Sequence, residues 1–162
     1  MLTRIAPGTS HVARDKQARR PSHVALSTYP MAHVISFKTA RFDVSKEPPN
    51  RINPIAGQSV LVWLRQELLT AGYKSTEPDT EDWGWYVDVE GGGASYLVGA
   101  SGDAEGSTVD VEWTLQIDKV RSMKDRLLGR NKMASDDPLS ALVERLIRAD
   151  SRIEQISVDR DG

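Results

Sequence analysis

The side chains best suited to chemistry in this sequence are carboxylates that recur at alternate positions of two stretches. In residues 82–90 and 108–118, apolar residues occupy one parity and polar residues the other, as in strands with one buried face. The polar parity would bring these side chains onto one face of a sheet: Asp82, Tyr86, Asp88, Asp110, Glu112 and Gln116.

Carboxylates on neighbouring strands can ligate a divalent metal or act as an acid–base pair. They are equally typical of the solvated face of an antiparallel sheet, and both chemical uses need a specific geometry. We therefore assign no catalytic residue and no metal site. We take five of these side chains as a candidate partner-binding face: Asp82, Tyr86, Asp88, Asp110 and Glu112. A helix covering this face would exclude so many unpaired acids there.

A basic run between residues 119 and 132 is the alternative candidate surface. It contains Lys119, Arg121, Lys124, Arg126, Arg130 and Lys132. Such a run can contact phosphates. Four apolar residues recur within it at helical spacing, so it also fits the solvated face of an amphipathic helix.

Several reaction classes lack their usual residues. The chain has no cysteine and three histidines, of which His11 and His23 lie near the N-terminus. With His33 alone in the structured part, zinc sites and Ser-His-Asp or Cys-His triads are not expected. Neither a G-x-G-x-x-G fingerprint nor a G-x-S-x-G elbow occurs, and Gly91-Gly92-Gly93 precedes a strand rather than a helix. We expect no cofactor.

The four tryptophans could form a platform for stacking on a ligand. Because Trp63, Trp83, Trp85 and Trp113 all fall on apolar parities or stripes, packing in the core is favoured instead. Gly84, between two of them, predicts a bulge or a close approach of another backbone.

Two amphipathic helices must pack against these strands. The first is predicted to begin at Asn53 as N-cap with Pro54 in its first position and to end at Gly72. The second is predicted to begin at Asp137, with Pro138 in its first position. Apolar residues at spacings of three and four form a stripe along each helix.

Further strands are expected around the helices. A first strand at 33–44 would need a bulge near Ala40 to keep its apolar residues on one face, and Pro48-Pro49 blocks regular structure after it. Other strands are predicted at 94–100 and 152–159. The order β-α-β-β-β-α-β predicts an α+β two-layer sandwich with a mainly antiparallel sheet of four to five strands and two main helices.

Composition limits the class of protein. The chain has 162 residues, 39% of them hydrophobic and 27% charged, and no apolar run long enough for a membrane-spanning helix. Residues 1–32 hold five bases and one acid, a net of +4, so the rest of the chain carries −6. An acidic globular part argues against nucleic acid as the main partner.

Residues 1–32 are polar and punctuated by proline, which predicts a disordered tail, and Met31 is an alternative start. Residues 33–159 then form a single α+β domain. The string Glu81–Tyr86, with Arg121-Ser122 and 125–131 further on, resembles small uncharacterised bacterial proteins and favours a bacterial cytoplasmic location.

The leading interpretation is a soluble, non-enzymatic domain that binds another protein, as an immunity or antitoxin-like partner or an accessory subunit. The alternative is a carboxylate-based enzyme, with or without a divalent metal. A second alternative is nucleic-acid binding through the basic 119–132 segment.

Overall fold

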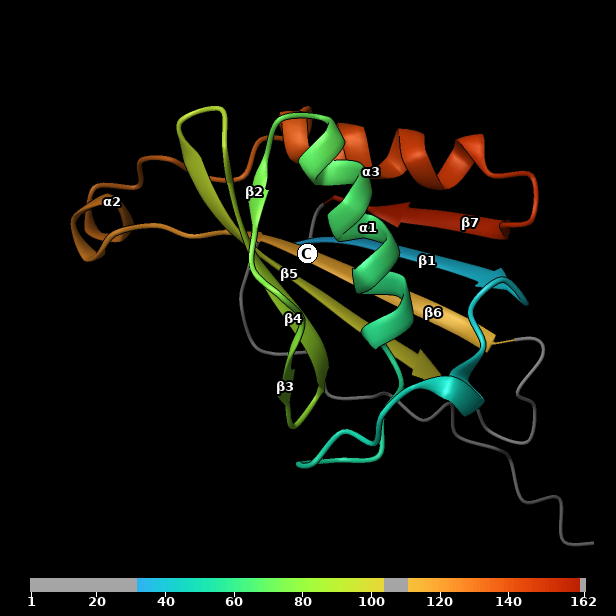
Figure 1. Cartoon of the computed structure of the whole chain (residues 1–162). Helices are drawn as coiled ribbons and strands as arrows, with labels where there is room; N and C mark the ends of the chain where they lie inside the picture. The colour runs from blue at the N-terminus through green and yellow to red at the C-terminus, as the bar shows by residue number, and fades with distance from the viewer. Residues whose placement is uncertain (1–31, 104–110, 161–162) are drawn as a thin grey trace, which may run out of the picture.

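The computed structural model describes residues 32–103 and 111–160, which form an α+β fold. A single antiparallel sheet of seven strands is accompanied by three α-helices in these residues (Figure 1). The predicted tail at 1–32 lies outside the described residues except for Ala32, which is buried. None of the helices in the described part could span a lipid bilayer.

The strands are hydrogen-bonded in the order β2-β4-β5-β6-β1-β7, and β3 also pairs with β4. Their bounds are β1 His33–Thr39, β2 Lys74–Ser75, β3 Asp79–Glu81, β4 Gly84–Gly91, β5 Ala94–Asp103, β6 Val111–Lys119 and β7 Glu154–Asp159. The predicted count of four to five strands is too low, because β2 and β3 have only two and three residues and so show no recognisable alternation.

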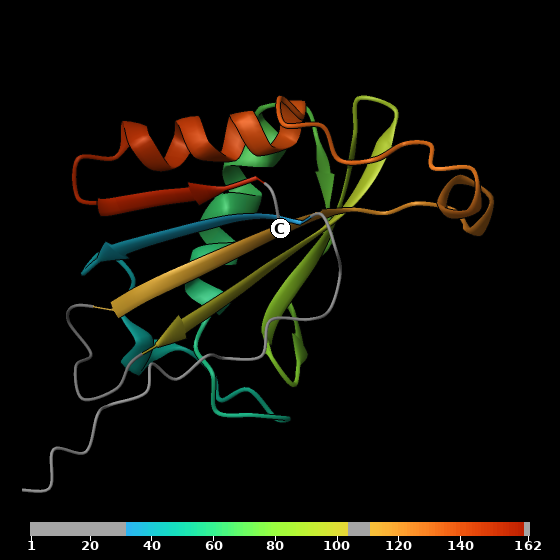
Figure 2. The ribbon, with the colours of Figure 1, turned by 180° about the vertical axis from the view of Figure 1, so that it is seen from behind.

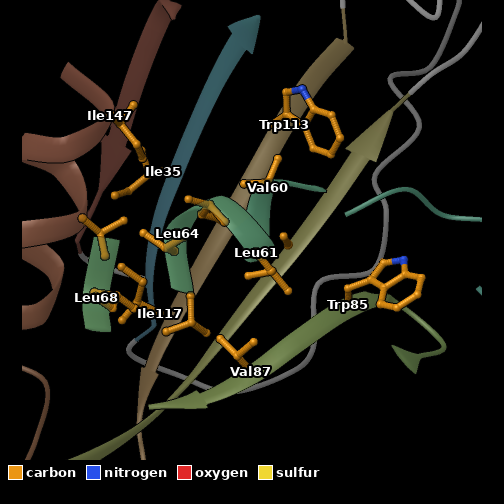
Figure 3. Packing of buried hydrophobic residues seen from close by; sticks show 14 of the residues in the cluster. Ile35, Val60, Leu61, Leu64, Leu68, Trp85, Val87, Trp113, Ile117 and Ile147 are labelled. Carbon is orange, nitrogen blue, oxygen red and sulfur yellow. The ribbon is translucent and has the colours of Figure 1, made fainter. Parts of the chain in front are cut away.

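The helices are α1 Gln58–Thr70, α2 Met123–Leu127 and α3 Pro138–Ala149, with a short 3-10 turn η1 at Val44–Lys46. The predicted order β-α-β-β-β-α-β therefore omits α2 as well as the two short strands. In Figure 1 α1 crosses in front of the sheet, and in Figure 2, from behind, the strands lie in front of α1. Apolar side chains of α1 and α3 join one core with the buried parity of the strands (Figure 3).

Helix α1 begins later than its sequence predicts. Asn53 does not cap it, because the Asn53 side chain donates to the Asp82 carbonyl at 2.9 Å, and the N-cap is Gly57. The predicted end is confirmed. Gly72 adopts φ +89°, and its N–H donates to the Leu69 carbonyl while that of Tyr73 donates to Leu68, a Schellman motif. Within the helix the predicted stripe is buried at Val60, Leu61, Leu64 and Leu68.

The first strand is shorter than predicted and has no bulge at Ala40. It ends at Thr39, and a turn follows before η1. Phe42 is nevertheless buried, because the turn brings its ring to 5.7 Å from the rings of both Trp63 and Trp113. Thus the predicted alternation is confirmed for residues 33–39, and the apolar residue beyond them reaches the core through the turn.

The start of α3 is confirmed. Asp137 is the N-cap, its Oδ1 accepts the backbone N–H of Leu139 at 3.0 Å, and Pro138 is the first helical residue. The last strand, β7, is confirmed within the predicted range 152–159. These two elements bring the C-terminal part of the chain back to β1, which pairs with both β6 and β7.

Candidate functional site

The face of the sheet opposite α1 carries most of the predicted polar side chains. We call this surface the open face, because neither long helix covers it in Figures 1 and 2. Tyr86, Asp88, Glu112 and Gln116 all belong to its parity, although Gln116 is itself buried, at 6% exposed. Their strand neighbours Trp85, Val87, Trp113 and Leu115 are buried in the core. Asp88 and Glu112 are exposed, so the prediction that they face solvent is confirmed.

One of the predicted carboxylates does not lie on a strand of this group, and another cannot be placed in it. Asp82 lies in the turn between β3 and β4, because β4 begins only at Gly84. Asp110 lies outside the described residues. The prediction that Asp82 lies in the strand is therefore wrong, because the turn of the tight β3–β4 hairpin occupies the position predicted for the start of that strand. The role of Asp82 in partner binding stays a prediction.

The same hairpin brings two unpredicted carboxylates to the open face. In β3, Asp79 pairs with Tyr86 and Glu81 pairs with Gly84. Burial raises the pKa of the Tyr86 phenol, and the charges of Asp79, Asp88 and Glu81 raise it further. With only three residues, β3 is too short to give a recognisable alternation in the sequence.

Trp83 lies on the open face and not in the core. A Cβ built on Gly99 would stand 2.4 Å from the Trp83 ring, and Gly99 pairs with Tyr86 and Gln116, both of the open-face parity. The prediction that all four tryptophans pack in the core is therefore wrong for Trp83. It holds for Trp85 and Trp113, which are buried, while Trp63 packs half-buried against the core.

The absence of a side chain at Gly84 allows the β3–β4 hairpin to lie close to the backbone of β5. Its φ is +151°, and a Cβ there would stand 2.4 Å from the Ala100 carbonyl oxygen, so the predicted close approach of another backbone is confirmed. The open face thus has an apolar and aromatic centre, with Leu97 half-buried between Asp88 and Asp118 in the register. Most charged residues of this face are carboxylates, although Lys38 and Lys74 also lie on it, opposite Glu112 and Glu90 in the register.

The basic run forms a separate feature, which we call the arm and define as residues 120–132. It leaves the end of β6, contains α2, and extends beyond the sheet in both Figure 1 and Figure 2. Ser122 caps α2 by accepting the Asp125 N–H at 3.1 Å. Gly129, at φ +64°, ends the helix in a second Schellman motif, because the Arg130 N–H donates to the Asp125 carbonyl at 2.8 Å.

The apolar side chains of the arm do not pack on the core. Met123 is 78% exposed and Leu127 85%, and Val120 and Leu128 are exposed as well. Part of the segment with helical spacing does form a helix, α2, but the apolar side of this helix is exposed. The cations Arg121, Lys124, Arg126, Arg130 and Lys132 lie among these side chains, and none forms an ion pair with another residue of the described part.

Lys119, the first cation of the predicted run, has a different role. Its Nζ lies 3.3 Å from Oδ2 of Asp137, which is 1% exposed. The Tyr96 hydroxyl donates to the same oxygen at 3.1 Å, and burial together with the Asp137 charge raises the pKa of Tyr96. This buried cluster fixes the start of α3 and leaves Lys119 out of the arm's exposed surface.

A serine–histidine pair also lies beside α3. His33 Nδ1 is 2.7 Å from Ser140 Oγ, but the two residues are 1% and 2% exposed, so a substrate could not reach the hydroxyl. Asp137 accepts the Ser140 backbone N–H and serves the helix cap. Among the residues of known placement, no three His, Asp or Glu side chains converge as metal ligands would.

Comparison with known proteins finds no matching family model, no similar curated protein and no similar solved structure. Function must therefore be inferred from the two surfaces themselves, the open face and the arm.

Proposed function

We propose that this chain is a non-enzymatic protein-binding domain, an immunity or antitoxin-like partner or an accessory subunit, and that the arm makes the contact. The observation that carries this proposal is the exposure of Met123 and Leu127 at 78% and 85%. Large apolar side chains gathered on one projecting segment are typical of an interaction site.

The energetics favour a protein as partner. Fully burying a leucine or methionine side chain contributes roughly 1.5–3 kcal/mol, so the exposed apolar residues of the arm could supply much of a binding free energy. The surrounding cations would steer the arm towards an acidic partner and reject a basic one. An apolar groove with an acidic rim is the chemistry that matches the arm.

Nucleic acid is the second candidate, and the observation that favours it is the set of arm cations without ion pairs in the described part. Binding of phosphates alone would give the leucines of the arm no role. The two candidates therefore differ in which side chains of the arm they need.

Site-specific photo-crosslinking tests this difference. A photoreactive amino acid replaces Met123 in one variant and Arg145, an exposed residue of α3, in a matched control. In cells of the source organism, the Met123 probe should crosslink a discrete protein, and the Leu127→Ser/Leu128→Ser variant should abolish the product. Crosslinking to nucleic acid alone, unaffected by the leucine substitutions, would overturn the proposal.

A second control separates specific contact from general surface hydrophobicity. Val62 and Leu69 on α1 are also exposed, at 52% and 38%. The Val62→Ser/Leu69→Ser variant removes two apolar side chains without touching the arm, so it should leave the crosslink intact.

A further inference from the structure

We infer that the partner of the arm is the open face of a second copy of this chain. This inference rests on the proposed function, because it names the protein that the arm binds. The two surfaces that the sequence offered as alternatives would then be the two halves of one contact.

Charge is divided unequally between the arm and the rest of the molecule. The described residues hold 16 cations and 19 carboxylates, and the arm holds 5 of those cations and Asp125 alone among the carboxylates. The arm therefore carries +4 and the other described residues −7. A body with this charge repels polyanions such as nucleic acid or an anionic bilayer, whereas it attracts the arm of another copy.

The open face offers matching groups for the arm. Asp79, Asp88 and Glu112 are exposed there, and Leu97, Tyr86 and Trp83 give it a half-buried apolar and aromatic centre. The arm has the complementary composition, because Met123, Leu127 and Leu128 lie among cations. Apolar side chains of the arm would pack at the centre while its cations meet the surrounding carboxylates.

The direction of the arm makes this a contact between copies. Figures 1 and 2 show α2 projecting beyond the sheet, past the end of β6, so the arm extends away from the sheet of its own chain. Within one chain, Arg126 and Arg121 act on Asp118 at the end of β6: burial raises the pKa of Asp118, and the charges of these two arginines partly offset that rise. A neighbouring copy can present the whole face to the arm.

The test is a charge-swap experiment read by sedimentation equilibrium. The arm variant is Lys124→Glu/Arg126→Glu, and the face variant is Asp88→Lys/Glu112→Lys; all four side chains are exposed. The parent chain should self-associate at low salt and dissociate as salt rises. Each variant alone should associate at least about tenfold more weakly.

Restoration by the combined variant is the decisive result. A chain carrying both sets of reversals has carboxylates at arm positions 124 and 126 and cations at face positions 88 and 112. Opposite charges can again meet across the contact at these positions, so its self-association should return towards that of the parent. Arg145→Glu on α3 is the matched control and should change nothing. Circular dichroism and thermal melting of every variant separate loss of association from loss of fold.

The alternatives give distinct outcomes. A parent chain that stays monomeric at low salt at its solubility limit would overturn the inference, as would single reversals that fail to weaken association or a combination that fails to restore it. If the monomeric chain still gives the Met123 crosslink, the proposed function stands with a different partner. Arm-dependent binding to phosphatidylserine vesicles or duplex DNA by a monomeric chain would overturn the inference in favour of a polyanion.

Discussion

The Glu47 carboxylate caps the start of α1 at Ser59, twelve positions further along the chain. Its Oε1 accepts the Ser59 N–H at 2.9 Å and its Oε2 accepts those of Gly57 and Gln58 at 2.8 and 3.2 Å. The Ser59 hydroxyl donates to the same carboxylate. A negative charge at a helix N-terminus also interacts favourably with the helix dipole. Glu47 thus supplies the capping hydrogen bonds that the N-cap residue, Gly57, cannot make because it has no side chain.

We expect Glu47→Ala to lower the free energy of unfolding by about 1–2 kcal/mol, the usual range for loss of a helix cap. Urea denaturation followed by circular dichroism measures the change. Glu77→Ala is the matched control, because the Glu77 side chain is 78% exposed and, among the described residues, pairs only with Arg65 at the surface. Its cost should stay below about 1 kcal/mol. Equal effects of the two substitutions would contradict the cap.

Gly99 and Trp83 should be energetically coupled. A methyl group at Gly99 would collide with the Trp83 ring, so Gly99→Ala should cost about 1–3 kcal/mol through forced movement of that ring. In the Trp83→Ala background the same substitution should cost much less. A double-mutant cycle of unfolding free energies measures this difference, and strictly additive effects would show that the ring does not lie over Gly99.

Lowering the pH should weaken the ion pairs of Asp150, which join Arg41, just after β1, to Arg152, just before β7. Hydrogen bonds from Arg152, with the charges of Arg41 and Arg152, hold the pKa of Asp150 well below its usual range, and Arg41 Nη1 lies 2.6 Å from Asp150 Oδ2. A depressed carboxyl pKa adds stability that is fully present above the unfolded value of about 3.9 and is lost as the pH falls through the folded value.

The Asp150→Asn variant should therefore be less stable than the parent at pH 7. The difference between their free energies of unfolding should narrow below about pH 4. Denaturation curves of both proteins across this range test the expectation. A difference in unfolding free energy that stays constant with pH would mean that Asp150 stabilises the fold through packing rather than through its charge.

Trp113 is the most deeply buried of the tryptophans in the described residues. It is fully buried, its ring contacts Phe42, and it packs over Gly102. Trp113→Ala should lower the free energy of unfolding by about 3–5 kcal/mol. Denaturation at equilibrium measures it, with half-buried Trp63→Ala expected to cost less. A loss below about 1 kcal/mol would show that the ring is not part of the core.

Much of this fold could be predicted from the sequence because the signals are local. Alternation marked β4 and β6, and Asp137-Pro138 and Gly72 marked the start of α3 and the end of α1, since caps and period-2 patterns involve residues only a few positions apart. The separation of Asp88 and Glu112 from the buried parity followed from the same alternation.

The rest depended on residues far apart in the chain. The start of α1 is fixed by Glu47, which no pattern near Gln58 predicts. Trp83 has the parity of Trp85 in the sequence, yet the β3–β4 turn carries it to the opposite face, over Gly99. Sequence spacing determined that the arm has an apolar side. Only the tertiary structure decided that this side remains exposed, because the core is already filled by α1, α3 and the strands.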